Sequence, residues 1–183
     1  TGTEWIHQRY PAGYPHTLDA EASQLLPCET LAYPLARQGE RFPFLAAHAL
    51  GFCIPLTDDA ARYHAACLQG TALLERLAYE VLDAVASTHG GDVFTTGGGG
   101  RNDLWLQCRA DVTGRVVHRP ASPESAFGSA ILAASGTIYD GWDRAVQGMV
   151  KLEKTFLPRP ERRAEYDRLY RAFCGELKGR GYL

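Results

Sequence analysis

Apolar side chains recur at helical spacing in two long segments of the chain. Between Asp58 and about Thr88, leucines and valines stand three or four residues apart, which predicts one long helix that ends at His89-Gly90-Gly91. A second segment with the same period predicts a helix that begins at Pro160, and residues 178–183 are expected to fray. The two stripes consist of Leu74, Leu77, Val81 and Val85, and of Tyr166, Leu169, Tyr170, Phe173 and Leu177.

Shorter elements alternate between these two helices. The predicted strands cover residues 92–96 and 115–118, and the predicted helices cover residues 102–112 and 123–135. Gly114 ends the first of these helices, Ser122-Pro123-Glu124 has the residue types of a start for the second, and Asp140 is expected to cap a further helix. Because strands and helices alternate, the sequence predicts an α/β layer structure.

The first 56 residues show no long helical period and are rich in proline, glycine, tyrosine and phenylalanine. Short strands are predicted over residues 3–10 and 29–35. Residues 39–44, Gly-Glu-Arg-Phe-Pro-Phe, are interpreted as a loop held by buried aromatic side chains.

Composition and charge narrow the class of protein. The chain has 183 residues, of which 45% are hydrophobic and 22% charged, as in a globular domain. A formal net charge of −2 argues against a nucleic-acid partner, and the absence of an 18-residue apolar run argues against a membrane partner. The five cysteines are an odd, scattered set without Cys-x-x-Cys, which predicts reduced thiols, a cytoplasmic location and no structural metal site.

The most informative segment is residues 95–102, Thr-Thr-Gly-Gly-Gly-Gly-Arg-Asn, where a predicted strand leads into a helix. Glycines allow a ligand to approach the backbone closely, and a helix N-terminus attracts phosphate. The alternative is a purely structural turn, but four consecutive glycines favour an anion or nucleotide site. Asn102 could cap the helix or turn its amide toward a base or ribose. No lysine follows as in a P-loop, and the third glycine of a dinucleotide-binding motif is absent.

Several segments together resemble the FGGY family of carbohydrate kinases. Residues 96–107 and 109–114 closely resemble the adenosine motif of that family, and residues 123–133 are similar to its small-residue helix. Residues 39–44 and 49–52 are similar to its opening segment, and Gly2-Thr3 is similar to the Gly-Thr of its second phosphate motif.

The resemblance implies an actin-like, ribonuclease-H-like ATPase fold with a mixed sheet and flanking helices. It implies ATP and Mg²⁺ as cofactors and transfer of the γ-phosphoryl group to a hydroxyl of a sugar, for which we favour a ketopentose. By this resemblance the cofactor-binding residues are Thr3, Gly97, Gly98, Gly99, Gly100 and Asn102. Thr3 would contact phosphate, Gly98 and Gly99 would lie along the α-phosphate and ribose, and Asn102 would lie near the adenine.

The resemblance also implies that residues 1–183 are the C-terminal nucleotide-binding domain of a two-domain kinase. The catalytic aspartate of the family stands in a Gly-x-x-Asp motif shortly before the Gly-Thr, so we expect it, with the sugar-binding N-terminal domain, outside this chain. No catalytic residue or metal ligand is therefore assigned within it. Pro55 replaces a usual glycine and residues 57–61 form a shorter loop than in the family, which puts purine contacts from this segment in doubt.

Two alternative functions, neither of them enzymatic, stay open at this point. The chain could be a non-catalytic actin-like nucleotide-binding module that regulates a partner, or a scaffold whose glycine turn is structural only. If a second domain is absent, its apolar contact face would be exposed, and a homodimer is then expected.

Overall fold

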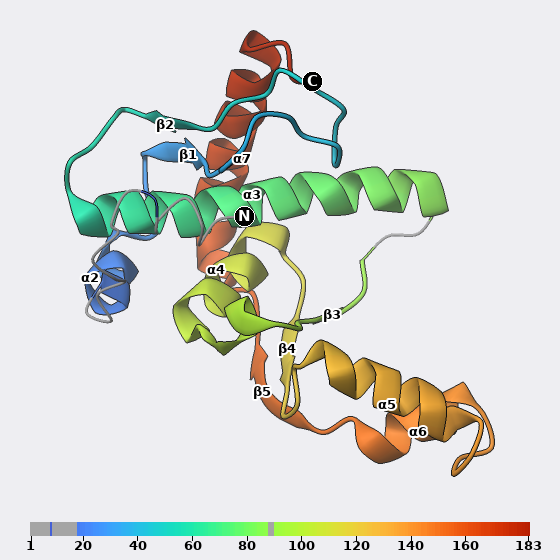
Figure 1. Ribbon diagram of the computed structural model, residues 1–183. Coiled ribbons are helices and arrows are strands. Elements are labelled where there is room, and N and C mark those ends of the chain that lie inside the picture. The colour runs from blue at the N-terminus through green and yellow to red at the C-terminus, as the bar shows by residue number, and fades with distance from the viewer. Residues whose placement is uncertain (1–7, 9–17, 88–89) are drawn as a thin grey trace.

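The structure is a computed structural model that describes residues 8, 18–87 and 90–183, so most of the strand predicted over residues 3–10 lies outside the described part. One long helix, α3 (Ala60–Ala86), crosses the molecule and separates an upper from a lower group of elements in Figure 1. The upper group contains β1 (Leu31–Tyr33), β2 (Phe52–Ile54) and much of α7 (Arg163–Gly179). The remaining elements are α2 (Leu18–Leu25), β3 (Val93–Phe94), the 3₁₀ turn η1 (Gly98–Arg101), α4 (Asp103–Thr113), β4 (Val117–Pro120), α5 (Ser125–Ser135), α6 (Trp142–Met149), β5 (Leu152–Phe156) and the 3₁₀ turn η2 (Pro160–Arg162).

The main core lies where the N-terminal half of α3 meets β1, α2 and α7. Strands β1 and β2 pair antiparallel, with Ala32 opposite Cys53. Gly70 of α3 lies so close to β1 that a Cβ there would come within 1.8 Å of the Ala32 carbonyl oxygen, so this crossing requires glycine. The fully buried Gln69 side chain accepts from the Cys28 N–H at 2.9 Å and donates to the Cys28 carbonyl at 2.7 Å. These contacts fix the register of α3 on the first strands.

The second layer is a three-stranded mixed sheet in the order β3-β4-β5. Strand β3 pairs parallel with β4, and β5 pairs antiparallel with β4. Buried side chains between this sheet and α4 form a small second cluster: Val93, Leu106, Ala110, Val117 and Phe156. The predicted α/β class is confirmed, and the sheet is mixed.

The long helix forms as predicted, but its buried part differs from the prediction. Its N-cap Asp59 accepts from the Arg62 N–H, and Ser87 ends it in the left-handed conformation. The fully buried residues of α3 all lie between Ala61 and Leu73, whereas Val85, a member of the predicted stripe, is 82% exposed. The apolar stripe of the C-terminal half therefore has no complete cover among the described residues.

The prediction that residues 178–183 fray is wrong. The Gly181 and Tyr182 N–H groups donate to the carbonyls of Lys178 and Leu177, and Gly181 has a φ of +71°, as in a Schellman cap. Tyr182 is buried, its ring stacks on Phe44 with centroids 6.3 Å apart, and its hydroxyl accepts from the Leu50 N–H at 2.9 Å. The glycine-aromatic pair at the helix end therefore anchors the tail.

Other boundaries are partly confirmed. Helix α4 has the predicted caps, with Asn102 before it and Gly114 after it. Glu124 rather than Ser122 precedes α5, and Gly141 rather than Asp140 precedes α6. Of the aromatic residues in the 39–44 loop, Phe44 is buried and Phe42 is 48% exposed. All five cysteines lie in the described part, and none of them forms a disulfide, as predicted.

Within the described ranges, no helix is both long and apolar enough to cross a lipid bilayer.

Candidate nucleotide site

The glycine turn connects the end of β3 with the start of α4. Gly97 has a φ of +79°, which glycine adopts readily and other residues rarely do, and its N–H donates to the Pro123 carbonyl at 2.7 Å. The next four residues form the 3₁₀ turn η1, whose first internal hydrogen bond runs from the Gly100 N–H to the Gly97 carbonyl. The N–H groups of Gly98 and Gly99 precede this bond, so the turn itself does not use them.

The four glycines fall into two groups by what surrounds them. A Cβ at Gly97 or Gly98 would meet no atom of the described residues within 4 Å. At Gly99 it would lie 2.0 Å from the Trp105 ring, and at Gly100 it would lie 3.2 Å from the Thr95 side chain. Packing therefore requires glycine at Gly99 and favours it at Gly100. No contact among the described residues requires glycine at Gly98, and its φ is not positive.

Both polar atoms of the Asn102 side chain form hydrogen bonds within the protein. Its Oδ1 accepts from the Trp105 N–H at 2.9 Å, which caps α4, and its Nδ2 donates to Asp19 of α2 at 2.9 Å. The other Asp19 oxygen lies 2.8 Å from Nε2 of the buried His64. Burial lowers the pKa of His64, although the Asp19 carboxylate opposes that shift. The capping alternative is therefore observed, while a contact of Asn102 with adenine stays a prediction. Thr3 lies outside the described residues.

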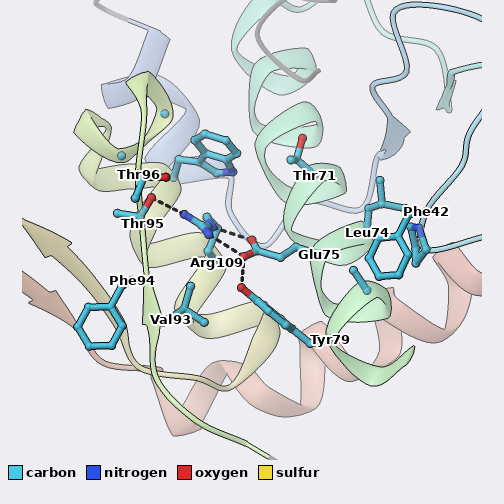
Figure 2. A pocket seen from close by; sticks show the side chains of 15 residues that line it. Phe42, Thr71, Leu74, Glu75, Tyr79, Val93, Phe94, Thr95, Thr96 and Arg109 are labelled. Atoms are coloured by element: carbon cyan, nitrogen blue, oxygen red, sulfur yellow. Dashed lines mark hydrogen bonds and ion pairs between the residues drawn. The ribbon is translucent and has the colours of Figure 1, made fainter. Parts of the chain in front are cut away.

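A cavity of about 520 Å³ lies beside the glycine turn, between α3 and β3 (Figure 2). Apolar and polar side chains both line it. Its wall includes Phe42, Pro43, Thr71, Leu74, Glu75, Ala78, Tyr79, Val93, Phe94, Thr95, Thr96, Gly99, Gly100, Trp105 and Arg109. The Trp105 Nε1 atom is buried without a hydrogen-bond partner among the described residues, so it remains available as a donor.

An ion pair crosses the cavity wall from α4 to α3. Arg109 donates from Nε and Nη2 to the two Glu75 carboxylate oxygens, each at 2.6 Å, and from Nη1 to the Thr95 hydroxyl at 3.0 Å (Figure 2). The Tyr79 hydroxyl donates to the same carboxylate at 2.9 Å. Burial lowers the pKa of Arg109, but the hydrogen bonds and charge of Glu75 outweigh it, so the Arg109 pKa is raised. Burial, with a smaller effect of Glu75, raises the pKa of Tyr79 to about 12.

Arg109 is paired rather than solvated in the structure. The sequence alone does not identify Glu75 as its partner. Glu75 follows Leu74 by one residue and so lies off the stripe of Leu74 and Leu77, and its pairing with Arg109 is a contact between α3 and α4 that helical spacing does not reveal.

The described residues fit phosphate better than they fit a metal ion. The open backbone at Gly98, with its unused N–H at the start of a turn into a helix, has the chemistry of an anion cradle. Residues 18–87 and 90–183 contain no group of three histidine, cysteine or carboxylate side chains that could hold a metal.

The mixed sheet, its flanking helices and the glycine turn define an α/β domain of the actin-like ATPase class, the fold of the solved structures that resemble it. Residues 6–137 match the FGGY family of carbohydrate kinases, C-terminal domain. The chain belongs to this family.

Individual relatives agree with this assignment. A xylulose kinase of Staphylococcus epidermidis is 25% identical over 92% of this chain and 35% of its own. An FGGY carbohydrate kinase domain-containing protein of Xenopus laevis is 31% identical over 74% of this chain and 26% of its own. The crystal structure of xylulose kinase from Rhodospirillum rubrum matches 98% of this chain and 38% of its own, with a TM-score of 0.78 and 27% identity. This chain thus spans roughly a third of the length of these relatives.

Proposed function

We propose that residues 1–183 are the nucleotide-binding C-terminal domain of an ATP-dependent carbohydrate kinase. The complete enzyme transfers the γ-phosphoryl group of ATP to a sugar hydroxyl in the cytoplasm and requires Mg²⁺. A ketopentose such as xylulose is the proposed acceptor, because relatives from Staphylococcus epidermidis and Rhodospirillum rubrum are xylulose kinases.

The open position at Gly98 is the observation that carries the proposal. Gly98 is the first residue of η1, four residues after the end of β3 and shortly before α4, where a phosphate would meet backbone N–H groups. Of the six proposed cofactor-binding residues, Gly97 and Gly98 have space around the position of a Cβ. Gly99 and Gly100 pack against the side chains of Trp105 and Thr95 and so fix the shape of the turn. Asn102 holds the helix start, and Thr3 is proposed to contact phosphate by resemblance alone.

The same proposal places the catalytic carboxylate and the sugar-binding domain outside this chain. Phosphoryl transfer requires a residue that positions the acceptor hydroxyl and ligands for Mg²⁺, in addition to a nucleotide cradle. The cradle is proposed at the glycine turn, and the described residues contain no group of three histidine, cysteine or carboxylate side chains that could hold a metal. We therefore expect residues 1–183 alone to bind nucleotide weakly, with a dissociation constant of about 0.1–1 mM, and not to phosphorylate sugars.

A matched pair of glycine substitutions tests the nucleotide site. Gly98→Val adds a branched side chain whose Cβ would meet no atom of the described residues within 4 Å, so we expect it to take space from the ligand rather than to disturb the fold. We expect it to weaken MgADP binding at least tenfold, about 1.4 kcal/mol, in calorimetric titrations of the chain. Gly175→Val is the control, because Gly175 in α7 is equally open and is exposed. Equal affinities of both variants, with unchanged melting temperatures, would refute the site.

A further inference from the structure

Two side chains lie directly behind the glycine turn. A Cβ at Gly99 would come within 2.0 Å of the Trp105 ring, and a Cβ at Gly100 would come within 3.2 Å of the Thr95 side chain. Thr95 is buried, and its backbone N–H donates to the His118 carbonyl at 2.9 Å. Because close-packed groups move together, the positions of these two side chains determine the position of the turn.

Arg109 contacts both of these side chains. Its Nη1 donates to the Thr95 hydroxyl at 3.0 Å, and its guanidinium carbon lies 5.6 Å from the centre of the Trp105 ring. Trp105 and Arg109 are four residues apart in α4, so they share one face of that helix. One guanidinium group therefore links the two side chains on which the turn packs.

The long helix α3 fixes this guanidinium group. Both Glu75 carboxylate oxygens accept from Arg109 at 2.6 Å, and the Tyr79 hydroxyl donates to the same carboxylate at 2.9 Å (Figure 2). Two hydrogen bonds to one carboxylate hold a planar guanidinium group in one orientation. Glu75 comes two residues after Leu73, the last buried residue of α3, so this anchor lies next to the part of the helix that packs in the main core.

Resting on the proposed function, we propose that Arg109, anchored on Glu75, is a positioning residue for the nucleotide. It acts through Thr95 and Trp105, which hold the glycine turn where its free N–H groups meet a phosphate. Hydrogen bonds to phosphate depend steeply on distance and angle, so a shift of the turn by about 1 Å is enough to weaken binding about tenfold.

The alternative is that the ion pair is purely structural, and the neighbouring arginine provides the comparison. Arg76 follows Glu75 in α3 and donates to the Asp167 carboxylate of α7 at 2.6 Å. Its further partners belong to α3, to the last turn of α4 and to α7: Glu80, the Val112 carbonyl and the Tyr170 ring. Substitution of Arg76 therefore removes a largely buried ion pair of α3 without a change behind the glycine turn.

Calorimetric titration of the complete polypeptide encoded by the gene with MgADP tests the role of Arg109. Arg109→Met and Arg76→Met are a matched pair, because the two side chains are 12% and 13% exposed and each loses a carboxylate partner at 2.6 Å. Both substitutions are expected to lower the melting temperature. Only Arg109→Met is expected to raise the dissociation constant for MgADP, by about tenfold. Equal dissociation constants of the two variants would overturn the proposal.

Two substitutions of Thr95 test the connection to the turn while the ion pair stays intact. Thr95→Val removes the hydroxyl that accepts from Arg109 and keeps a side chain of nearly the same shape, whereas Thr95→Ser keeps the hydroxyl. We expect Thr95→Val to weaken MgADP binding about fivefold and Thr95→Ser to stay within about twofold of the parent. Equal affinities of the two Thr95 variants would contradict the proposal, also in the case that Arg109→Met does not fold.

Kinase kinetics separate positioning from partial unfolding. Arg109→Met is expected to raise the KM for MgATP about tenfold and to leave the KM for the sugar within about twofold of the parent. A variant that merely unfolds in part loses active enzyme, which lowers kcat and changes neither KM. If Gly98→Val binds MgADP like the parent, the proposed site and this role are both wrong. If Gly98→Val weakens binding but the Arg109 and Thr95 variants do not, the positioning role alone is wrong.

Discussion

Removing the Glu75 carboxylate should destabilise the domain more than a typical surface substitution would. The Glu75 and Arg109 side chains are only 19% and 12% exposed, and two hydrogen bonds of 2.6 Å join them. Loss of one partner of a buried pair typically costs about 3–5 kcal/mol, because the other charge stays buried. Glu75→Gln keeps one acceptor oxygen, so we expect about 3 kcal/mol, a fall in melting temperature of about 6–12 °C for a domain of this size.

Urea unfolding followed by circular dichroism measures this free energy. Asp140→Asn is the control, because Asp140 pairs with Arg144 at 3.6 Å with 91% of its side chain exposed, and it should change stability by less than about 0.5 kcal/mol. The double variant Glu75→Leu/Arg109→Met leaves no unpaired charge. Its loss of stability should therefore be smaller than the sum of the losses in Glu75→Leu alone and Arg109→Met alone. A Glu75→Gln variant within about 0.5 kcal/mol of the parent, or additive single effects, would refute the buried pair.

Three further outcomes follow from burial. Burial raises the pKa values of Tyr33, Tyr79, Tyr166 and Tyr170. The folded state therefore holds these phenol protons more tightly, so the contribution of these tyrosines to stability should be constant to about pH 10 and then fall as pH rises toward 12. An absorbance titration at 295 nm in which all tyrosines ionise together near pH 10 without unfolding would contradict this. Tyr182→Ala should cost about 3 kcal/mol because the ring is buried on Phe44, whereas a frayed tail predicts no loss in urea unfolding. Burial raises the pKa of Cys108 to about 12, so in native protein Cys108 should resist a thiol reagent that labels the half-buried Cys53. After denaturation all five thiols should react with the reagent, and a disulfide in freshly purified protein would contradict this.

Local sequence signals predicted much of the fold. The long helix, the caps of α4 at Asn102 and Gly114, and the buried face of α7 all follow from side-chain period and cap residues. Strand β5 was not predicted, because only Phe156 of its five residues is buried and a strand with one exposed face of charged residues has no apolar alternation. Helix α2 and strand β2 are also too short for a clear period.

The position of the candidate site was predictable from the sequence, but the role of each glycine in it was not. Four consecutive glycines marked the turn, yet sequence alone could not tell that Gly99 is required by the Trp105 ring while Gly98 is open. That distinction depends on where α4 places its indole, which is a tertiary contact. The same limit applies to Val85, which belongs to an apolar stripe by spacing and is exposed because no described element covers it.

Phosphoryl transfer by the complete polypeptide tests the central claim most directly. ADP release, measured in a coupled assay with MgATP and a panel of ketoses and polyols, should depend on the sugar and respond best to a ketopentose. Residues 1–183 alone should give no sugar-dependent ADP, because we propose that the acceptor site and the carboxylate that positions the acceptor lie outside this chain. Absence of sugar-dependent turnover from the complete polypeptide, despite MgATP binding, would favour a non-catalytic nucleotide-binding module. Sugar-dependent turnover by residues 1–183 alone, free of contaminating kinase, would show that the catalytic residue lies within this chain.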